Sequence, residues 1–174
     1  MRAIAIQFMS AALFASLASG QTPATERDHV VPFTYAKTEQ AVQEIATLVR
    51  HMTDLGQVST DSARTTLSLR GTSDQIALAE WLVAKLDRPA PPARQDQTLE
   101  YRLPGGGDNV VRVFYLTHAA TPQKLQKIAT TVRGATAVRR LFTYNALRAL
   151  SLRGTSDQIA LAGQLIEERD TPNP

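Results

Sequence analysis

The chain has 174 residues, no cysteine and a formal net charge of +3. This length predicts one domain or two small ones, and 43% hydrophobic with 20% charged residues is typical of a folded globular protein. The absence of cysteine excludes thiol catalysis, disulfides, cysteine-ligated zinc and iron–sulfur clusters. The small basic excess, without a basic tract, argues against nucleic acid as the main partner.

The first twenty residues have the pattern of a secretory signal peptide. One positive charge precedes an apolar run over residues 3–18, and small residues end the segment at Ala18 and Gly20. We predict that residues 1–20 are cleaved and that the mature protein is periplasmic or secreted. A retained N-terminal anchor helix is the alternative, although the run is short and rich in small residues for a membrane span. We expect no membrane span in the mature chain.

The remainder of the chain contains one sequence unit twice. The segment Leu67–Ala79 recurs letter for letter as Leu150–Ala162, so Arg153 follows its counterpart Arg70 by 83 residues. The same offset aligns the rest of both units without a gap, and about half of the aligned positions are identical. Such internal identity indicates a duplication.

The two copies are predicted to form two sequential modules, over residues 28–89 and 99–172. Prolines between them predict a stiff, extended linker over residues 90–98. After the linker, apolar and polar residues alternate on both sides of a glycine-rich turn. This pattern predicts a hairpin from Leu99 to Val113, added in front of the second module.

In chain order, each module is predicted to contain a strand, a helix, two strands and a closing helix. In the first module these are a strand at Val30–Tyr35, a helix capped by Thr38, strands at Gln57–Thr60 and Thr66–Arg70, and a helix opened by the capping box Thr72–Gln75. The fold class is therefore α+β, with two tandem βαββα modules joined by the Pro-rich linker. Modules of this size are marginal alone, so the two are expected to support each other or a partner.

These motifs resemble the periplasmic N-domain modules of secretins, the outer-membrane gate proteins of secretion and type IV pilus systems. The likeness lies in the opening segment Val31–Ala36, the strand–Gly–Thr step Leu69–Thr72 and the helix end Leu86–Pro89. It covers both modules and implies a KH-like βαββα fold, with a role in protein–protein assembly. There are two departures. The 174 residues contain no stretch that we expect to form the pore-forming domain of the family, and Arg169 stands where the first closing helix has Leu86.

The sequence contains no group of residues with the spacing of a catalytic site or a metal site. His29, His51 and His118 are not repeated and form no ligand pair, so we expect them on the surface. The repeated acids, which are Asp74 and Asp87 with their counterparts, are explained by helix starts and ends. No Gly-x-Ser-x-Gly turn or phosphate-binding loop is present. We therefore predict a protein that is not an enzyme and needs no cofactor or metal.

Three side chains are candidates for contacting a protein partner or another copy of the chain. Arg70 and Arg153 are repeated, and strand alternation predicts that both are exposed, with solvated strand ends as the alternative reading. Trp81 falls away from the apolar stripe of its helix, and an exposed tryptophan suits a binding hot spot. The alternative is that Trp81 packs against the linker or the other module. Its counterpart is Gln164, so this feature is not duplicated.

The favoured function is an exported protein–protein interaction or assembly module, accessory to a secretion or pilus system. Two alternatives remain open from the sequence. KH-like folds bind nucleic acid in other proteins. The Gly-x-x-Gly clamp of the nucleic-acid-binding class is absent from this sequence, and export would separate the protein from nucleic acid. An exported enzyme is the second alternative, for which the chain offers no constellation.

Overall fold

The computed structural model describes residues 25–89, 100–105 and 107–172, so the predicted signal peptide and the predicted linker lie outside the described residues. The first unit contains β1 (Arg27–Pro32), α1 (Glu39–Met52), β2 (Gln57–Asp61), β3 (Thr66–Gly71) and α2 (Ser73–Leu86). The second contains β4 (Glu100–Arg102), β5 (Val110–Tyr115), α3 (Pro122–Thr136), β6 (Arg140–Tyr144), the short 3-10 helix η2 (Asn145–Leu147), β7 (Ala149–Gly154) and α4 (Ser156–Arg169).

Each unit folds around one antiparallel sheet. Sheet A has the strand order β1-β3-β2, and sheet B has the order β4-β5-β7-β6. The registers correspond, since Arg27 pairs with Gly71 in sheet A and Val110 pairs with Gly154 in sheet B. Strand β4 extends sheet B by pairing with β5 as an antiparallel hairpin. The predicted α+β class with two βαββα units is confirmed, whereas the domain limits at 28–89 and 99–172 stay predictions.

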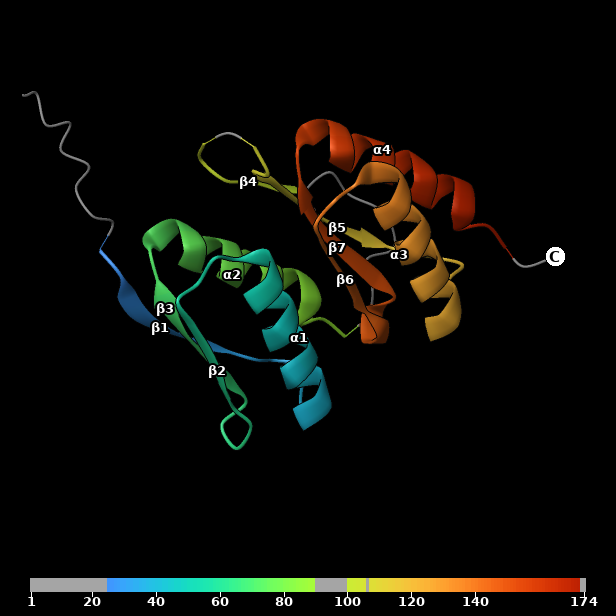
Figure 1. Ribbon diagram of the computed structural model, residues 1–174. Helices are drawn as coiled ribbons and strands as arrows, with labels where there is room; N and C mark the ends of the chain where they lie inside the picture. The colour runs from blue at the N-terminus through green and yellow to red at the C-terminus, as the bar shows by residue number, and fades with distance from the viewer. Residues whose placement is uncertain (1–24, 90–99, 106, 173–174) are drawn as a thin grey trace, which may run out of the picture.

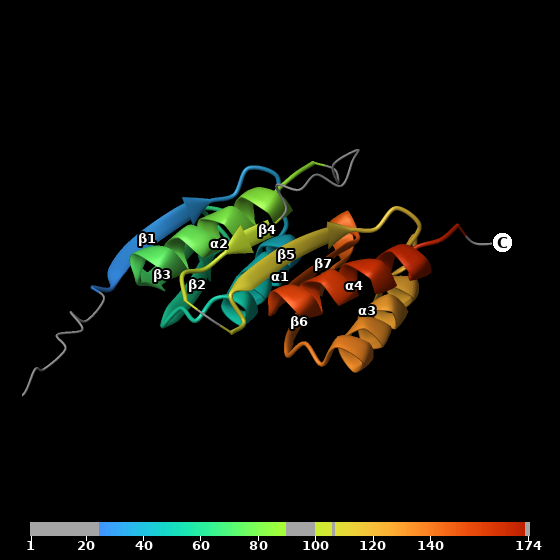
Figure 2. The ribbon, with the colours of Figure 1, turned by 90° about the horizontal axis from the view of Figure 1, so that it is seen from above.

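The elements stack in four layers: sheet A, helices α1 and α2, sheet B, and helices α3 and α4 (Figures 1 and 2). Helices α1 and α2 of the first unit therefore lie between the two sheets. Sheet B is covered on both faces, by its own helices on one side and by the first unit's helices on the other. In the part of the chain that the structure describes, sheet A has helices on one face only (Figure 2).

Local sequence explains how the helices begin. Both closing helices start with a capping box, in which a threonine accepts from the third helical amide and a glutamine reaches back to the threonine amide. The preceding glycines make room for that glutamine. A Cβ on Gly71 would lie 2.7 Å from Gln75 Oε1, and one on Gly154 would lie 2.7 Å from Gln158 Oε1. The identical repeat thus encodes the same strand-to-helix step twice.

The first strand runs over Arg27–Pro32, so it begins before the predicted Val30 and ends before the predicted Tyr35. The carboxylate of Asp87, at the end of α2, accepts hydrogen bonds from the amides of the three loop residues Thr34, Tyr35 and Ala36. Those amides are therefore satisfied without a strand partner. The same arrangement recurs in the second unit, where Asp170 accepts from Thr117 and His118.

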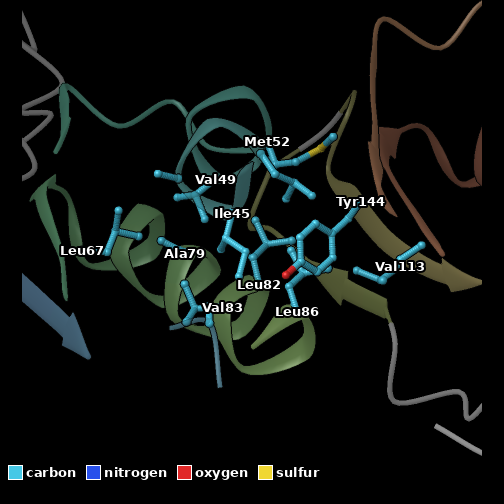
Figure 3. Close-up of a cluster of buried hydrophobic side chains, with 14 of the residues drawn as sticks. Ile45, Val49, Met52, Leu67, Ala79, Leu82, Val83, Leu86, Val113 and Tyr144 are labelled. Atoms are coloured by element: carbon cyan, nitrogen blue, oxygen red, sulfur yellow. The ribbon is translucent and has the colours of Figure 1, made fainter. Parts of the chain in front are cut away.

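The two units share a hydrophobic core. One buried cluster contains residues of α1, α2 and β3 together with Val111, Val113, Tyr115, Tyr144 and Leu147 of the second unit (Figure 3). A second cluster lies between sheet B and its own helices. The expectation that two marginal units support each other is confirmed by this shared cluster.

Candidate functional site

Arg70, one of the predicted contact residues, lies exposed at the end of β3. Its side chain is 55% exposed and its Nε lies 3.5 Å from Glu26 Oε2. It borders a shallow hollow of about 270 Å³ on the outer face of sheet A, whose lining includes Val30, Ser59 and Ser68. The prediction of an exposed Arg70 is confirmed.

Arg153, its counterpart in sheet B, is not exposed, so that prediction is wrong. Its side chain is only 13% exposed and lies at the junction of the two units. Nη1 donates to the carbonyl of Met52 at 2.7 Å and pairs with Asp54 at 3.0 Å, while Nε donates to the carbonyl of Asp108 at 2.9 Å. Strand alternation correctly gave the face of the sheet, but that face is covered by the first unit.

Asp54 joins the units at the rim of their shared core. Its carboxylate accepts from Arg140 at 2.6 Å and from Arg153 at 3.0 Å. The hydrogen bond from Arg140, together with the charges of both guanidinium groups, lowers the pKa of Asp54 despite the opposing effect of partial burial. The linkage between the units is therefore ionised at neutral pH and weakens as the pH falls through that lowered pKa.

Trp81, the third predicted contact residue, lies away from the most buried stripe of α2 but is half-buried against the second unit. Its ring centroid lies 5.6 Å from that of Tyr101 on β4, and the ammonium group of Lys85 lies 5.9 Å from the Trp81 ring. The expectation of a freely exposed ring is corrected, because the added strand β4 covers it. Contact with an outside partner required a ring that packs on nothing within the chain, and this condition is not met.

Tyr144 is the central residue of the interface, and sequence reasoning missed it. The ring is 3% exposed and lies beside Leu82 and Leu86 of α2 (Figure 3). Burial, reinforced by the negative charges of Glu44 and Asp87, raises the pKa of Tyr144 to about 12. A clue was available in the sequence, because Val111, Val113 and Tyr115 are apolar at positions that alternation assigns to the outer face.

The outer face of sheet A carries the counterparts of these interface residues. Asp28, Val30 and Pro32 of β1 correspond to Val111, Val113 and Tyr115 of β5. On the other strands, Ser59 and Asp61 stand where β6 has Phe142 and Tyr144. All of these sheet A positions are at least partly exposed. The two sheets therefore share a backbone plan, but sheet A presents a more polar outer face.

A second hollow lies between α3 and α4, on the side that faces away from sheet B. It has a volume of about 460 Å³. Its lining includes Lys124, Lys127, Ile128, Thr131 and Arg169. Under the repeat offset these are the counterparts of Ala41, Glu44, Ile45, Leu48 and Leu86. Of that set, Ile45 and Leu86 lie beside Tyr144 in the shared core (Figure 3), so the second unit's tyrosine covers helix positions whose counterparts line the hollow. The hollow itself is basic, because Lys124, Lys127 and Arg169 line it.

The histidines have local contacts. His29 Nε2 lies 2.7 Å from Glu80 Oε1, and the His51 ring is tilted against Phe142 with centroids 5.7 Å apart. Over the described residues, no three His, Cys, Asp or Glu side chains gather closely enough to hold a metal ion. The repeated Asp87 and Asp170 act as acceptors for loop amides, which is a structural role.

Within the described residues, none of the helices combines the length and apolar character needed to cross a bilayer.

No family model and no curated protein matches the chain. Among solved structures it is similar to the N-terminal domain of the secretin XcpQ from Pseudomonas aeruginosa, at 18% identity and a TM-score of 0.35, over 84% of this chain and 62% of that one. A chain of the ETEC pilotin–secretin complex AspS–GspD is similar at 17% identity and a TM-score of 0.31, over 85% of this chain and 25% of that one. Dim2p from Pyrococcus horikoshii OT3 is similar at 17% identity and a TM-score of 0.40, over 85% of this chain and 93% of that one. At such low TM-scores these likenesses assign neither a family nor a function to this chain, which spans under two thirds of either secretin chain.

Proposed function

We propose that this chain is an exported protein–protein assembly module, accessory to an envelope secretion or pilus system, and that it docks a protein partner on the outer face of sheet A. The observation that carries the proposal is the contrast between the two sheets. Sheet B uses its outer face to bind the helices of the neighbouring unit. Among the described residues nothing covers the corresponding face of sheet A, which is built on the same registers.

The chemistry of this face suits a docked protein. Val30 is 56% exposed there, and Arg70 stands at its edge as a charged donor. The serines Ser59 and Ser68 are small, so a partner's side chains can approach the strands closely in the hollow. Arg70 is the predicted contact residue that remains in this proposal. Arg153 and Trp81 are engaged in joining the two units.

Export is supported by the N-terminal sequence, whose charge, apolar run and small residues have the order of a signal peptide. The resemblance of the sequence motifs to secretin N-domains supports a place beside an envelope secretion or pilus system. Both points concern residues and motifs rather than the fold. The periplasm or the exterior is therefore the compartment in which the partner is to be sought.

Site-specific cross-linking tests the proposal, because the chain lacks cysteine and any introduced thiol is unique. Ser68→Cys carries the cross-linker on the outer face of sheet A, and Ala84→Cys carries it on an exposed position of α2. In exporting cells we expect discrete protein adducts from position 68 and none from position 84. Equal labelling at both positions, or no adduct at position 68, would overturn the proposal.

A further inference from the structure

The stack of layers ends differently on its two sides. One end is the outer face of sheet A, and the other is the outer face of α3 and α4 (Figure 2). Within the chain, the same two kinds of face already meet, where sheet B packs on α1 and α2. We propose that a second copy of the chain docks head to tail, with sheet A of one copy on α3 and α4 of the next, which repeats the intrachain interface. This inference rests on the proposed function and names its partner.

The hollow between α3 and α4 is the first evidence. Tyr144 of the second unit lies beside Ile45 and Leu86 on the helices of the first unit (Figure 3), and the charge of Glu44 acts on its hydroxyl. On α3 and α4 the same positions hold Ile128, Arg169 and Lys127, and they line an open hollow of about 460 Å³. Helix positions that are covered in the first unit therefore stay open in the second, among the residues that the structure describes.

Charge complementarity indicates what fills it. The sheet A counterpart of Tyr144 is Asp61, whose side chain is 43% exposed and pairs with the exposed Arg64 of the same turn at 3.5 Å. A docking that repeats the intrachain interface brings this carboxylate to the basic hollow of Lys127 and Arg169. The two changes match each other: an acid stands in place of the tyrosine, and Lys127 and Arg169 stand in place of Glu44 and Leu86.

Two exposed apolar side chains would also be buried in the repeated interface. Val30 on sheet A is 56% exposed and Leu161 on α4 is 41% exposed. Their counterparts are Val113 and Leu78, which are both fully buried in the cluster shared by the two units. Repeating the interface between copies would cover Val30 and Leu161 together, and this burial favours association.

Such an interface joins two different surfaces, so each copy retains one free face of each kind after binding one neighbour. Heterologous contacts of this sort give rings if the rotation closes and open filaments if it does not. The outer face of sheet A is more polar than that of sheet B, so the contact between copies should be weaker than the contact within the chain. Its charged pair makes it weaker still at high salt.

Two variants separate this arrangement from a symmetric dimer. Val30→Arg blocks the sheet A face, and Leu161→Arg blocks the α3–α4 face, while each leaves the other face intact. We expect the purified chain to form larger species as its concentration rises in sedimentation velocity. Each variant alone should associate at least tenfold more weakly. An equimolar mixture should form dimers and nothing larger, because only one combination of faces is free of arginine.

The matched control is Ala84→Arg, which introduces the same side chain at a position of α2 that stays exposed beside the docked second unit. It should associate like the unmodified chain, and circular dichroism should show all three variants folded. A chain that stays monomeric at every concentration, variants that still assemble, or a mixture without dimers would overturn the inference. If position 68 then cross-links to a different protein, the proposed function stands while self-association fails.

Discussion

Sheet A and sheet B have the same strand order and the same registers, yet their outer faces differ in character. In sheet B the outer face carries Val111, Val113, Phe142 and Tyr144, all at least partly buried against the first unit. In sheet A the same positions are taken by residues such as Asp28, Ser59 and Asp61. The difference shows that every second residue of a strand decides whether a sheet faces water or a neighbour, while the fold of the unit stays the same.

The repeated arginines show the same divergence in a single side chain. Arg70 and Arg153 stand in identical thirteen-residue segments and at equivalent registers. Arg70 is exposed beside Glu26, whereas Arg153 is nearly buried and bonded to three groups. Paired substitutions at such equivalent positions therefore test how far the two units differ.

The largest expected effect is on Tyr144 and its counterpart Asp61. Tyr144→Ala removes a buried aromatic ring from the shared core, and we expect it to lower the free energy of unfolding by about 3–5 kcal/mol. Asp61→Ala removes only an exposed turn hydrogen bond and an exposed ion pair with Arg64, so this variant should lower the free energy of unfolding by about 1 kcal/mol or less. Urea denaturation of both variants measures this difference. Similar losses in the two would contradict the assignment of sheet B as the interface sheet.

The next effect concerns the acids that satisfy the loop amides. Asp87→Ala leaves three amides without their acceptor. Each such amide costs about 1 kcal/mol or more, so we expect the free energy of unfolding to fall by about 3 kcal/mol. Asp170→Ala removes the acceptor of two amides in a more exposed loop and should cost about 2 kcal/mol or less. Thermal unfolding compares them, and Ala84→Gly serves as a control for α2. A greater loss for Asp170→Ala would reverse the ranking.

Arg153→Ala should have the third largest effect. We expect it to lower the free energy of unfolding by about 2 kcal/mol, because it removes charged hydrogen bonds across the junction of the two units. Arg70→Ala breaks only an exposed ion pair and should cost less than about 0.5 kcal/mol. Arg153→Lys should recover only part of the loss, since a single ammonium group cannot reproduce the spread of guanidinium donors. Equal effects of the two alanine variants in urea would refute the divergence of this repeated pair.

Trp81→Gln places in α2 the residue that α4 has at the equivalent position. Because the ring is half-buried against Tyr101, we expect the free energy of unfolding to fall by about 1 kcal/mol. Trp81 is the one tryptophan of the chain, so its fluorescence reports directly on this contact. Tyr101→Ala should shift the emission to longer wavelength without unfolding the protein. An unchanged emission would place the ring elsewhere, and Gln164→Ala should be neutral.

The smallest effect has the opposite sign. The hydroxyl of Ser151 is buried in the interface and, among the described residues, has no hydrogen-bond partner. Ser151→Ala removes this unsatisfied group and should stabilise the protein by up to about 1 kcal/mol. Ser68→Ala, at the equivalent position of sheet A, should leave stability unchanged because that serine contacts solvent. A destabilised Ser151→Ala variant would show that the hydroxyl is satisfied.

Much of the fold was predictable from the sequence because its determinants are local. The capping boxes act over three residues, and apolar periodicity indicates helices and strands within short windows. The candidate site was less predictable. Arg70 was placed correctly. Arg153 was assigned to solvent, and Trp81 was left between an exposed contact and packing on the other module, because nothing near them in sequence shows that another unit covers them. The end of β1 was misplaced because its cause, Asp87, lies more than fifty residues further along the chain.

The order of elements, the repeated segments and the side of each strand on which a residue lies follow from local sequence. Which of two equivalent faces is covered follows from the packing of one unit on the other. Two identical segments, Leu67–Ala79 and Leu150–Ala162, form the same strand, turn and helix opening, because backbone geometry and capping depend on neighbours along the chain. Burial depends on groups distant in sequence, and the hydrogen bond from Arg153 to the carbonyl of Met52 joins residues 101 positions apart.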